Sequence, residues 1–284
     1  MIKSVFDRVW AFDSEWIPDP VSGRMLYHLP EEMPDHEVIH EMWKRAGATE
    51  EEPMPFLRTA MCRLVSLVVL ERHYRAGDVR LRLITLPEDT GNPERVAESH
   101  IVRSFLSGVG KYQPQVVGFN SINADLKIVV QRAAALGVQA KEFCTRPNKP
   151  WEGNDYFARG QDCNVDLMDI YAGFGRTSGI SLNEMAVVCG IPGKLGTSGD
   201  DVAGMWMRGE LDAIVHYNQF DAFTTYLLWL RTAYVAGHFT AEQYKTEQRM
   251  VQEYLEQLIA GGSEHLQIFL DEWRKLRTLR GLDF

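Results

Sequence analysis

The sequence predicts an α/β domain with a mixed β-sheet flanked by helices. Short apolar runs rich in β-branched residues are typical of buried strands, and five such runs occur along the chain. They occupy residues 9–12, 63–70, 79–86, 115–119 and a last stretch that begins at Val165. The first three follow one another and the later ones alternate with helical segments. The sheet is therefore expected to combine antiparallel and parallel strands.

Length and composition limit the function classes. The 284 residues, 45% of them hydrophobic, suffice for one large core or for one core with a helical appendage. Charged residues interrupt the first ten positions and no apolar run is long enough to span a bilayer, so we expect neither a leader nor a membrane segment. Four cysteines without a CxxC pair indicate the cytoplasm. A formal charge of −9 argues against a nucleic-acid-coating protein, yet it is compatible with a site where carboxylates hold metal ions.

Residues 18–58 are interpreted as an insertion after the first strand, because they are polar and interrupted by prolines. The insertion should contain one helix over residues 35–46, with Asp35 as its N-cap. This helix carries His36-Glu37-Val38-Ile39-His40, which fits the HExxH pattern of zinc metalloproteases. Two histidines four residues apart share a helical face and can bind zinc, with Glu37 as general base. The nearest candidate for a third ligand is the acidic run 50–52.

The other elements follow in order along the chain. The strands at 63–70 and 79–86 are separated by a turn at Gly77-Asp78, which indicates a hairpin. Helices are expected at 93–112, 125–136 and 211–234, and two amphipathic helices after Thr240 form a C-terminal extension. Residues 138–164 mix cations with aromatic side chains, a composition that suits stacking on single-stranded bases.

Asp13 and Glu15 follow the first strand's apolar run. Two positions apart on an extended strand, they project from the same face. Like charges at the end of a buried strand are costly unless a cation neutralises them. Either a metal site or a solvated strand end accounts for this pair when it is taken alone.

Two further acidic elements lie at places where α/β proteins bind ligands. Asn120-Ser121-Ile122-Asn123-Ala124-Asp125 joins a strand to a helix, and Asp125 is either a ligand at the strand's carboxyl end or a helix cap. Tyr217 and Asp221 are four residues apart in a helix, so they share one face. Asp166 and Asp169 are interpreted as helix-capping residues that face solvent.

Taken together, Asp13-x-Glu15, Asn120-x-x-Asn123-x-Asp125 and Tyr217-x-x-x-Asp221 resemble the three exonuclease motifs of the DEDD superfamily. Because the third motif contains a tyrosine, the resemblance is to the branch of this superfamily that contains the proofreading domain of family-B DNA polymerases. The chain is most similar to the bacterial stand-alone predicted 3′–5′ exonucleases related to that domain. The likeness includes Val165-Asp166-Leu167-Met168-Asp169, Ile191-Pro192-Gly193-Lys194 and residues 225–231. Ala124 and Trp16 depart from the family pattern, which puts substrate preference in doubt rather than chemistry.

The resemblance implies a ribonuclease-H-like fold with a mixed five-stranded sheet, and two Mg²⁺ or Mn²⁺ ions as cofactors. It implies that Asp13 bridges both ions, that Glu15 and Asp221 serve the nucleophile side, and that Asp125 holds the second ion mainly through water. Tyr217 would orient the attacking water. The residues expected to contact the substrate are Phe12, Ser14, Trp16, Asn120, Asn123 and Lys194.

The function expected from this resemblance is release of 5′-mononucleotides from the 3′ ends of single-stranded nucleic acid, with DNA preferred over RNA. The exonuclease domain is expected over residues 1–238, and residues 239–284 should form a helical extension that packs on it. Three alternatives remain: an exoribonuclease, a zinc protease through His36 and His40, and a non-catalytic nucleic-acid-binding module. The sequence indicates no protein partner.

Overall fold

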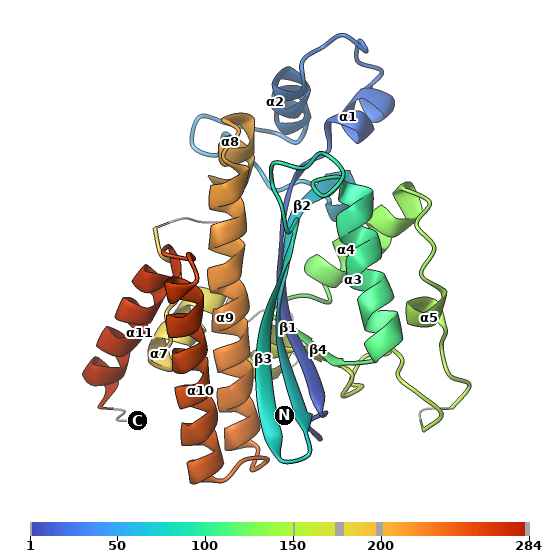
Figure 1. Ribbon diagram of the computed structural model, residues 1–284. Helices are drawn as coiled ribbons and strands as arrows, with labels where there is room; N and C mark the ends of the chain where they lie inside the picture. Colours follow the sequence, from blue (N-terminus) through green and yellow to red (C-terminus); the bar gives the residue numbers. More distant parts are fainter. Residues whose placement is uncertain (1, 150, 174–178, 197–200, 282–284) are drawn as a thin grey trace.

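A single mixed sheet forms the centre of the molecule. The computed structural model describes residues 2–149, 151–173, 179–196 and 201–281. Within these ranges the sheet has five strands in the order β3-β2-β1-β4-β5 (Figure 1). The strands are β1 (Arg8–Pro18), β2 (Cys62–Arg75), β3 (Asp78–Leu86), β4 (Gln115–Gly118) and β5 (Asn164–Asp166). β1 pairs antiparallel with β2 and parallel with β4, so the first strand lies in the middle. The predicted α/β class, a mixed five-stranded sheet flanked by helices, is confirmed.

The two faces of β1 contact different helical layers. Val9 and Ala11 belong to the core that includes α9 (Leu211–Val235), whereas Trp10 and Phe12 belong to the core formed with α3 (Glu98–Tyr112) and α4 (Asp125–Ala135). Successive side chains of a strand point to opposite faces. This alternation directs Asp13 and Glu15 toward α9.

α9 lies between the sheet and the C-terminal helices α10 (Ala241–Ala260) and α11 (Leu266–Arg280) (Figure 1). Because it is covered on opposite sides, α9 is apolar around most of its circumference instead of amphipathic. A buried ion pair joins α10 to the sheet, in which Arg72 donates to the two oxygens of Glu247 at 2.5 and 2.8 Å. Tyr226 of α9 also donates to Glu247, at 3.2 Å.

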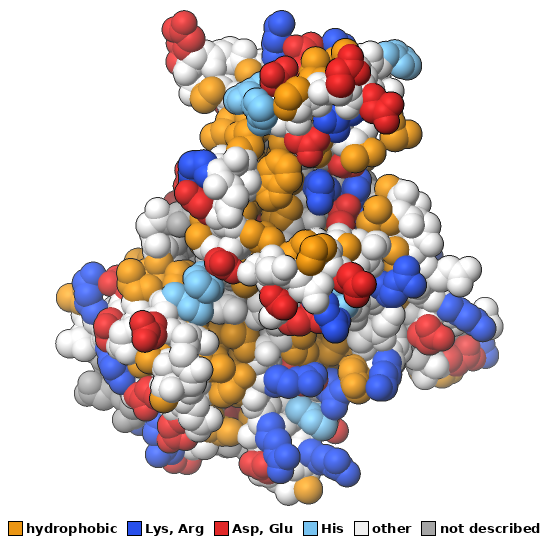
Figure 2. Space-filling view, turned by 45° about the horizontal axis from the view of Figure 1, so that its top comes forward, with side chains coloured by type: hydrophobic (Ala, Val, Ile, Leu, Met, Phe, Trp, Pro, Cys, Tyr) orange, Lys and Arg blue, Asp and Glu red, His pale blue; other side chains and the backbone are white. Residues whose placement is uncertain are grey.

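The remaining elements are short. They are α1 (Pro20–Tyr27), α2 (Asp35–Arg45), the 3-10 turn η1 (Thr59–Met61), α5 (Lys141–Cys144), α6 (Leu167–Tyr171), α7 (Leu182–Val188) and α8 (Val202–Met207). The predicted insertion contains α1 and α2, which form a lobe at the top of the molecule (Figure 1). Acidic and basic side chains are interspersed on this lobe, and hydrophobic side chains gather in the neck below it (Figure 2). No helix in the described ranges combines the length and hydropathy needed to cross a bilayer.

Two predicted helix starts were wrong. Asp35 does not cap α2: Pro34 holds the cap position, and Asp35 accepts a hydrogen bond from Arg24 at 2.7 Å. α3 begins at Glu98 and not at Pro93, because the residues before it form a separate turn in which Asn92 accepts from the Glu94 N–H at 2.9 Å. Residue 150 of the basic, aromatic stretch and residues 282–284 of the extension lie outside the described ranges.

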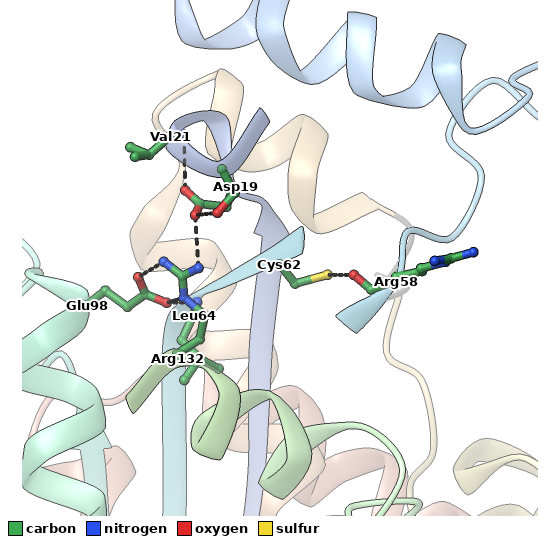
Figure 3. A network of polar contacts seen from close by, with 8 residues as sticks. Asp19, Val21, Arg58, Cys62, Leu64, Glu98 and Arg132 are labelled. Carbon is green, nitrogen blue, oxygen red and sulfur yellow. Dashed lines mark hydrogen bonds and ion pairs between the residues drawn. The ribbon is translucent and has the colours of Figure 1, made fainter. Parts of the chain in front are cut away.

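A buried cation fixes the start of the insertion to the core (Figure 3). Arg132 of α4 donates to both oxygens of Glu98 at 2.7 Å and to Asp19 at 2.9 Å. Asp19 caps α1, and Glu98 also accepts from the Leu64 N–H of β2 at 2.7 Å. Arg132 therefore links α3, α4 and the first residues of the insertion, close to the end of β1.

Candidate active site

Three carboxylates from distant parts of the sequence meet along β1, just past the residues of that strand that pair with β4. Asp13 and Glu15 come from the strand and Asp221 comes from α9, and each offers an oxygen within 4.8 Å of the others. Glu15 and Asp221 are buried, and Asp13 is partly buried. Within the described residues, the Asp13 and Glu15 side chains form no hydrogen bond or ion pair. A cluster of carboxylate oxygens that forms no ion pair with the described residues suits a hard divalent cation.

Burial and mutual repulsion shift the acidity of the cluster. Burial, followed by the charges of neighbouring carboxylates, raises the pKa of Asp13 and of Glu15 well above the ordinary value. Burial raises the pKa of Asp221 to about 7, although a hydrogen bond from Tyr217 and the charge of Lys194 act in the opposite direction. The raised pKa values indicate that Lys194 compensates the ionised cluster only in part, and a bound cation would supply further positive charge.

Asp125 lies near the cluster but is held from the other face of β1. Its Oδ1 accepts hydrogen bonds from the Ser14 N–H at 3.1 Å and from the Ser14 hydroxyl at 2.7 Å. Burial raises the pKa of Asp125 to about 6 despite these bonds. The charge of Asp125 in turn raises the pKa of Asp13 and Glu15, so the fourth carboxylate acts on the same electrostatic site. Asp125 is not a helix cap, because Ala124 holds that position.

α9 contributes two more polar side chains. Tyr217 is buried four residues before Asp221, and burial raises its pKa far above the ordinary value, so the phenol is neutral at physiological pH. Asn218, which sequence reasoning missed, bridges the backbone of β1. With its amide oriented so that both groups find partners, it donates to the Asp13 carbonyl and accepts from the Glu15 N–H, each at 3.1 Å. The only sequence signal for Asn218 was its place between Tyr217 and Asp221.

The turn that delivers Asp125 is held by polar contacts. Asn120 adopts a left-handed conformation with a φ of 61°, which asparagine tolerates, and its Oδ1 accepts from the Asn123 amide at 3.0 Å. Asp166 accepts from the Asn120 N–H at 2.8 Å and from the Ile122 N–H at 3.0 Å. Asp166 caps α6 as predicted, but the expectation that it faces solvent was wrong, since it is buried under this turn.

Lys194 is exposed and close enough for its charge to lower the pKa of Glu15 and of Asp221. Its position depends on the preceding glycine. The Lys194 N–H donates to Asn183 Oδ1 at 2.8 Å, and a Cβ at Gly193 would lie 2.1 Å from that oxygen. Only glycine allows this close approach, which sets Lys194 beside the carboxylates.

The other predicted substrate contacts differ in accessibility. The Phe12 side chain is 1% exposed and packs on Phe105 with ring centroids 5.1 Å apart, so the expectation that this side chain touches substrate was wrong. Ser14 is also buried and holds Asp125, so its predicted substrate contact is corrected in the same way. Trp16 is half-buried and lines a cavity of about 330 Å³ together with the insertion, including Phe56.

The HExxH motif does not assemble a metal site in the described part of the chain. His36 and His40 are exposed on α2. The only group of three or more metal-binding side chains among the described residues is Asp13, Glu15 and Asp221. Without a third ligand for the two histidines, the zinc-protease alternative has no structural support.

Comparison with solved structures finds similar chains. A family B DNA polymerase from the hyperthermophilic archaeon Pyrobaculum calidifontis is similar in structure, with a TM-score of 0.47 and 20% sequence identity. The match covers 80% of this chain and 24% of the polymerase, so the chain spans about a quarter of that protein's length. No curated protein matches the sequence.

A family model described as a predicted 3′–5′ exonuclease related to the exonuclease domain of PolB matches residues 54–273. The matched range includes Asp125, Tyr217 and Asp221, whereas Asp13 and Glu15 precede it. The structure supplies the missing connection, because these two residues meet Asp221 in space. The chain belongs to this family of predicted 3′–5′ exonucleases related to the exonuclease domain of PolB.

Proposed function

We propose that the protein is a metal-dependent 3′→5′ exonuclease that releases 5′-mononucleotides from single-stranded DNA. The observation that supports this proposal most strongly is the meeting of Asp13, Glu15 and Asp221, whose pKa values are raised and which form no ion pair with the described residues. In a family of predicted exonucleases, such a cluster is suited to hold two metal ions, because two-metal sites catalyse phosphodiester hydrolysis.

The four carboxylates, Asp125 included, would hold two Mg²⁺ or Mn²⁺ ions. Such ions, when bound, supply a hydroxide nucleophile at neutral pH and offset charge on the phosphate. Tyr217 remains protonated, so its hydroxyl can donate or accept a hydrogen bond and orient the attacking water. Lys194 is suited to attract a phosphate oxygen. Asn218 and Ser14 act as positioning residues, since they fix the backbone of β1 and the Asp125 carboxylate.

DNA is proposed over RNA because the sequence motifs resemble those of a proofreading domain. An exoribonuclease would use the same residues and is the second candidate. A non-catalytic binding module is disfavoured, because such a module would gain nothing from the buried repulsion among these carboxylates. A cytoplasmic location stays a proposal that rests on the cysteine pattern of the sequence.

The test uses DNA and RNA of one sequence, labelled at the 5′ end and incubated with Mg²⁺, Mn²⁺ or EDTA. We expect products that shorten by one nucleotide at a time from the 3′ end, only when metal is present. Asp221→Asn should release no nucleotide. Glu253→Gln is its matched control, because Glu253 is an exposed carboxylate on α10. Tight binding without nucleotide release, or cuts within a circular single strand, would contradict the proposal.

A further inference from the structure

A second cavity lies beside the turn that delivers Asp125. It has a volume of about 260 Å³, and its lining includes Ile122, Leu126 and Lys127, which flank Asp125 in the sequence. The opposite wall comes from the predicted basic and aromatic stretch and includes Phe157 and Arg159. The cavity is therefore within a few residues of the carboxylate site along the chain, and it shares no lining residue with the Trp16 cavity.

The cavity offers an aromatic surface. Phe157 is 42% exposed and is anchored at its edge by Phe143, with ring centroids 5.2 Å apart. Tyr156, which is buried, fixes this segment by donating to the Pro114 carbonyl at 2.7 Å. A partly exposed ring on an anchored segment is a suitable stacking partner for a flat heterocycle, because it loses little conformational freedom on binding.

The charge at the cavity is positive. Lys127 and Arg159 are exposed, and neither forms an ion pair with the described residues. The lining contains no acidic side chain, whereas four other cavities of the described chain each include at least two. Asp155, two residues before Phe157, is already paired with Arg146 at 2.9 Å. In a protein with a formal charge of −9, two cations at an apolar cavity indicate an anionic ligand with an apolar face.

Two hydrogen-bond acceptors in the lining lack donors. The side-chain oxygens of Gln131 and Asn164 are buried without a partner. The Asn164 amide is fixed by its other end, since its nitrogen donates to the Tyr156 carbonyl at 2.8 Å. Buried acceptors of this kind are costly unless a ligand donates to them. The ring N3–H of thymine and uracil is a donor of the required kind, as are the exocyclic amino groups of adenine and cytosine.

We propose that this cavity holds one nucleobase of the single strand whose 3′ end reaches the carboxylates. The inference rests on the proposed function and defines the substrate further: the enzyme grips its strand at a second point upstream of the scissile bond. Phe157 stacks on the base, Gln131 and Asn164 accept from its polar edge, and Lys127 and Arg159 contact the adjoining phosphates.

The first experiment measures binding of fluorescent dT20 and rU20 in EDTA, which prevents hydrolysis. Lys127→Ala with Arg159→Ala should lower the slope of log affinity against log salt by about 1.4, since each cation on a single strand contributes about 0.7. Arg75→Ala with Lys245→Ala is the matched control, because both residues are exposed and lie on β2 and α10. An unchanged slope in the Lys127 and Arg159 variant would overturn the proposal. An equal decrease in slope for dT20 and rU20 would show that the cavity binds both DNA and RNA.

The second experiment locates the base. An abasic residue is moved one position at a time from the 3′ end of dT20, and its cost in affinity is compared between the parent and Phe157→Leu. We expect one position where loss of the base weakens parental binding about 5- to 150-fold, the range for one stacked base, and where the variant shows a much smaller penalty. Leucine keeps the apolar contact with Phe143, and thermal unfolding of each variant verifies its fold. A positional profile that is the same in both proteins would overturn the proposal.

A separate assay tests the proposed function independently of the cavity. The parent protein is assayed with Mn²⁺ on the p-nitrophenyl ester of thymidine 5′-monophosphate, which has no second nucleotide. Hydrolysis of this ester tests the carboxylate site alone. If the ester and dT20 both remain intact, the proposed function fails, while the binding experiments still decide whether the cavity holds a base.

Discussion

Replacing Asp221 with asparagine should abolish turnover and at the same time stabilise the metal-free protein. The folded-state pKa of Asp221, about 7, lies above the unfolded value near 3.8. Between these values the folded protein binds the proton more tightly, so this carboxyl lowers stability progressively as pH rises from about 4 to 7. At about 1.4 kcal/mol per pH unit, the ionised group destabilises the fold by up to about 4 kcal/mol at pH 8 and by about 2 kcal/mol at pH 5.

Thermal unfolding in EDTA measures this effect. Asp221→Asn should raise Tm by up to about 10 °C at pH 8 and by about half as much at pH 5. Adding Mn²⁺ should stabilise the parent more than the variant, because the variant has lost a ligand. Glu253→Gln, the exposed control, should change neither the Tm in EDTA nor the stabilisation by Mn²⁺. A variant that is less stable than the parent at pH 8, or equally stabilised at both pH values, would refute the view that Asp221 is an uncompensated buried charge.

Three further outcomes are expected. Asp13→Ala should retain the fold and lose turnover even at saturating Mn²⁺, measured as release of 5′-mononucleotides; near-normal turnover would contradict a shared metal ligand. Tyr217→Phe should keep manganese affinity in calorimetric titration while lowering the single-turnover rate by ~10–1000-fold, a range typical of one lost orienting group; loss of the ions would contradict a positioning role. Arg132→Met should cost ~3–5 kcal/mol in urea unfolding, because Glu98 and Asp19 would remain buried without their cation; a change below ~1 kcal/mol would show that these acids become hydrated or protonated.

Periodicity predicted the strands and most helices because burial imposes it. The same-face placement of Asp13 and Glu15 followed from strand geometry alone, and Tyr217 with Asp221 followed from helical spacing. What spacing could not provide was the meeting of these pairs, which depends on α9 packing against β1. The motif resemblance supplied that link before the structure did.

The predictions of helix caps and of solvent exposure failed where a side chain can bind either a local or a distant partner. Asp35, Asp125 and Asp166 each occupy a position at or near a helix start, so capping is a possible role for all three, although for Asp125 it was the alternative to metal binding. Only Asp166 caps a helix, and it is buried under the Asn120 turn. Asp35 binds Arg24 and Asp125 binds Ser14, contacts between residues 11 and 111 positions apart that no local rule anticipates.

The ion pair between Arg72 and Glu247 has a consequence for shortening the chain. A truncation before Thr240 would remove α10 and α11, and with them Glu247, which pairs with Arg72 of the sheet. It would also expose the side of α9 that these helices cover, and α9 carries Tyr217 and Asp221. A minimal exonuclease cut at that boundary should therefore lose activity through unfolding, even though every proposed metal ligand and the tyrosine would still be present.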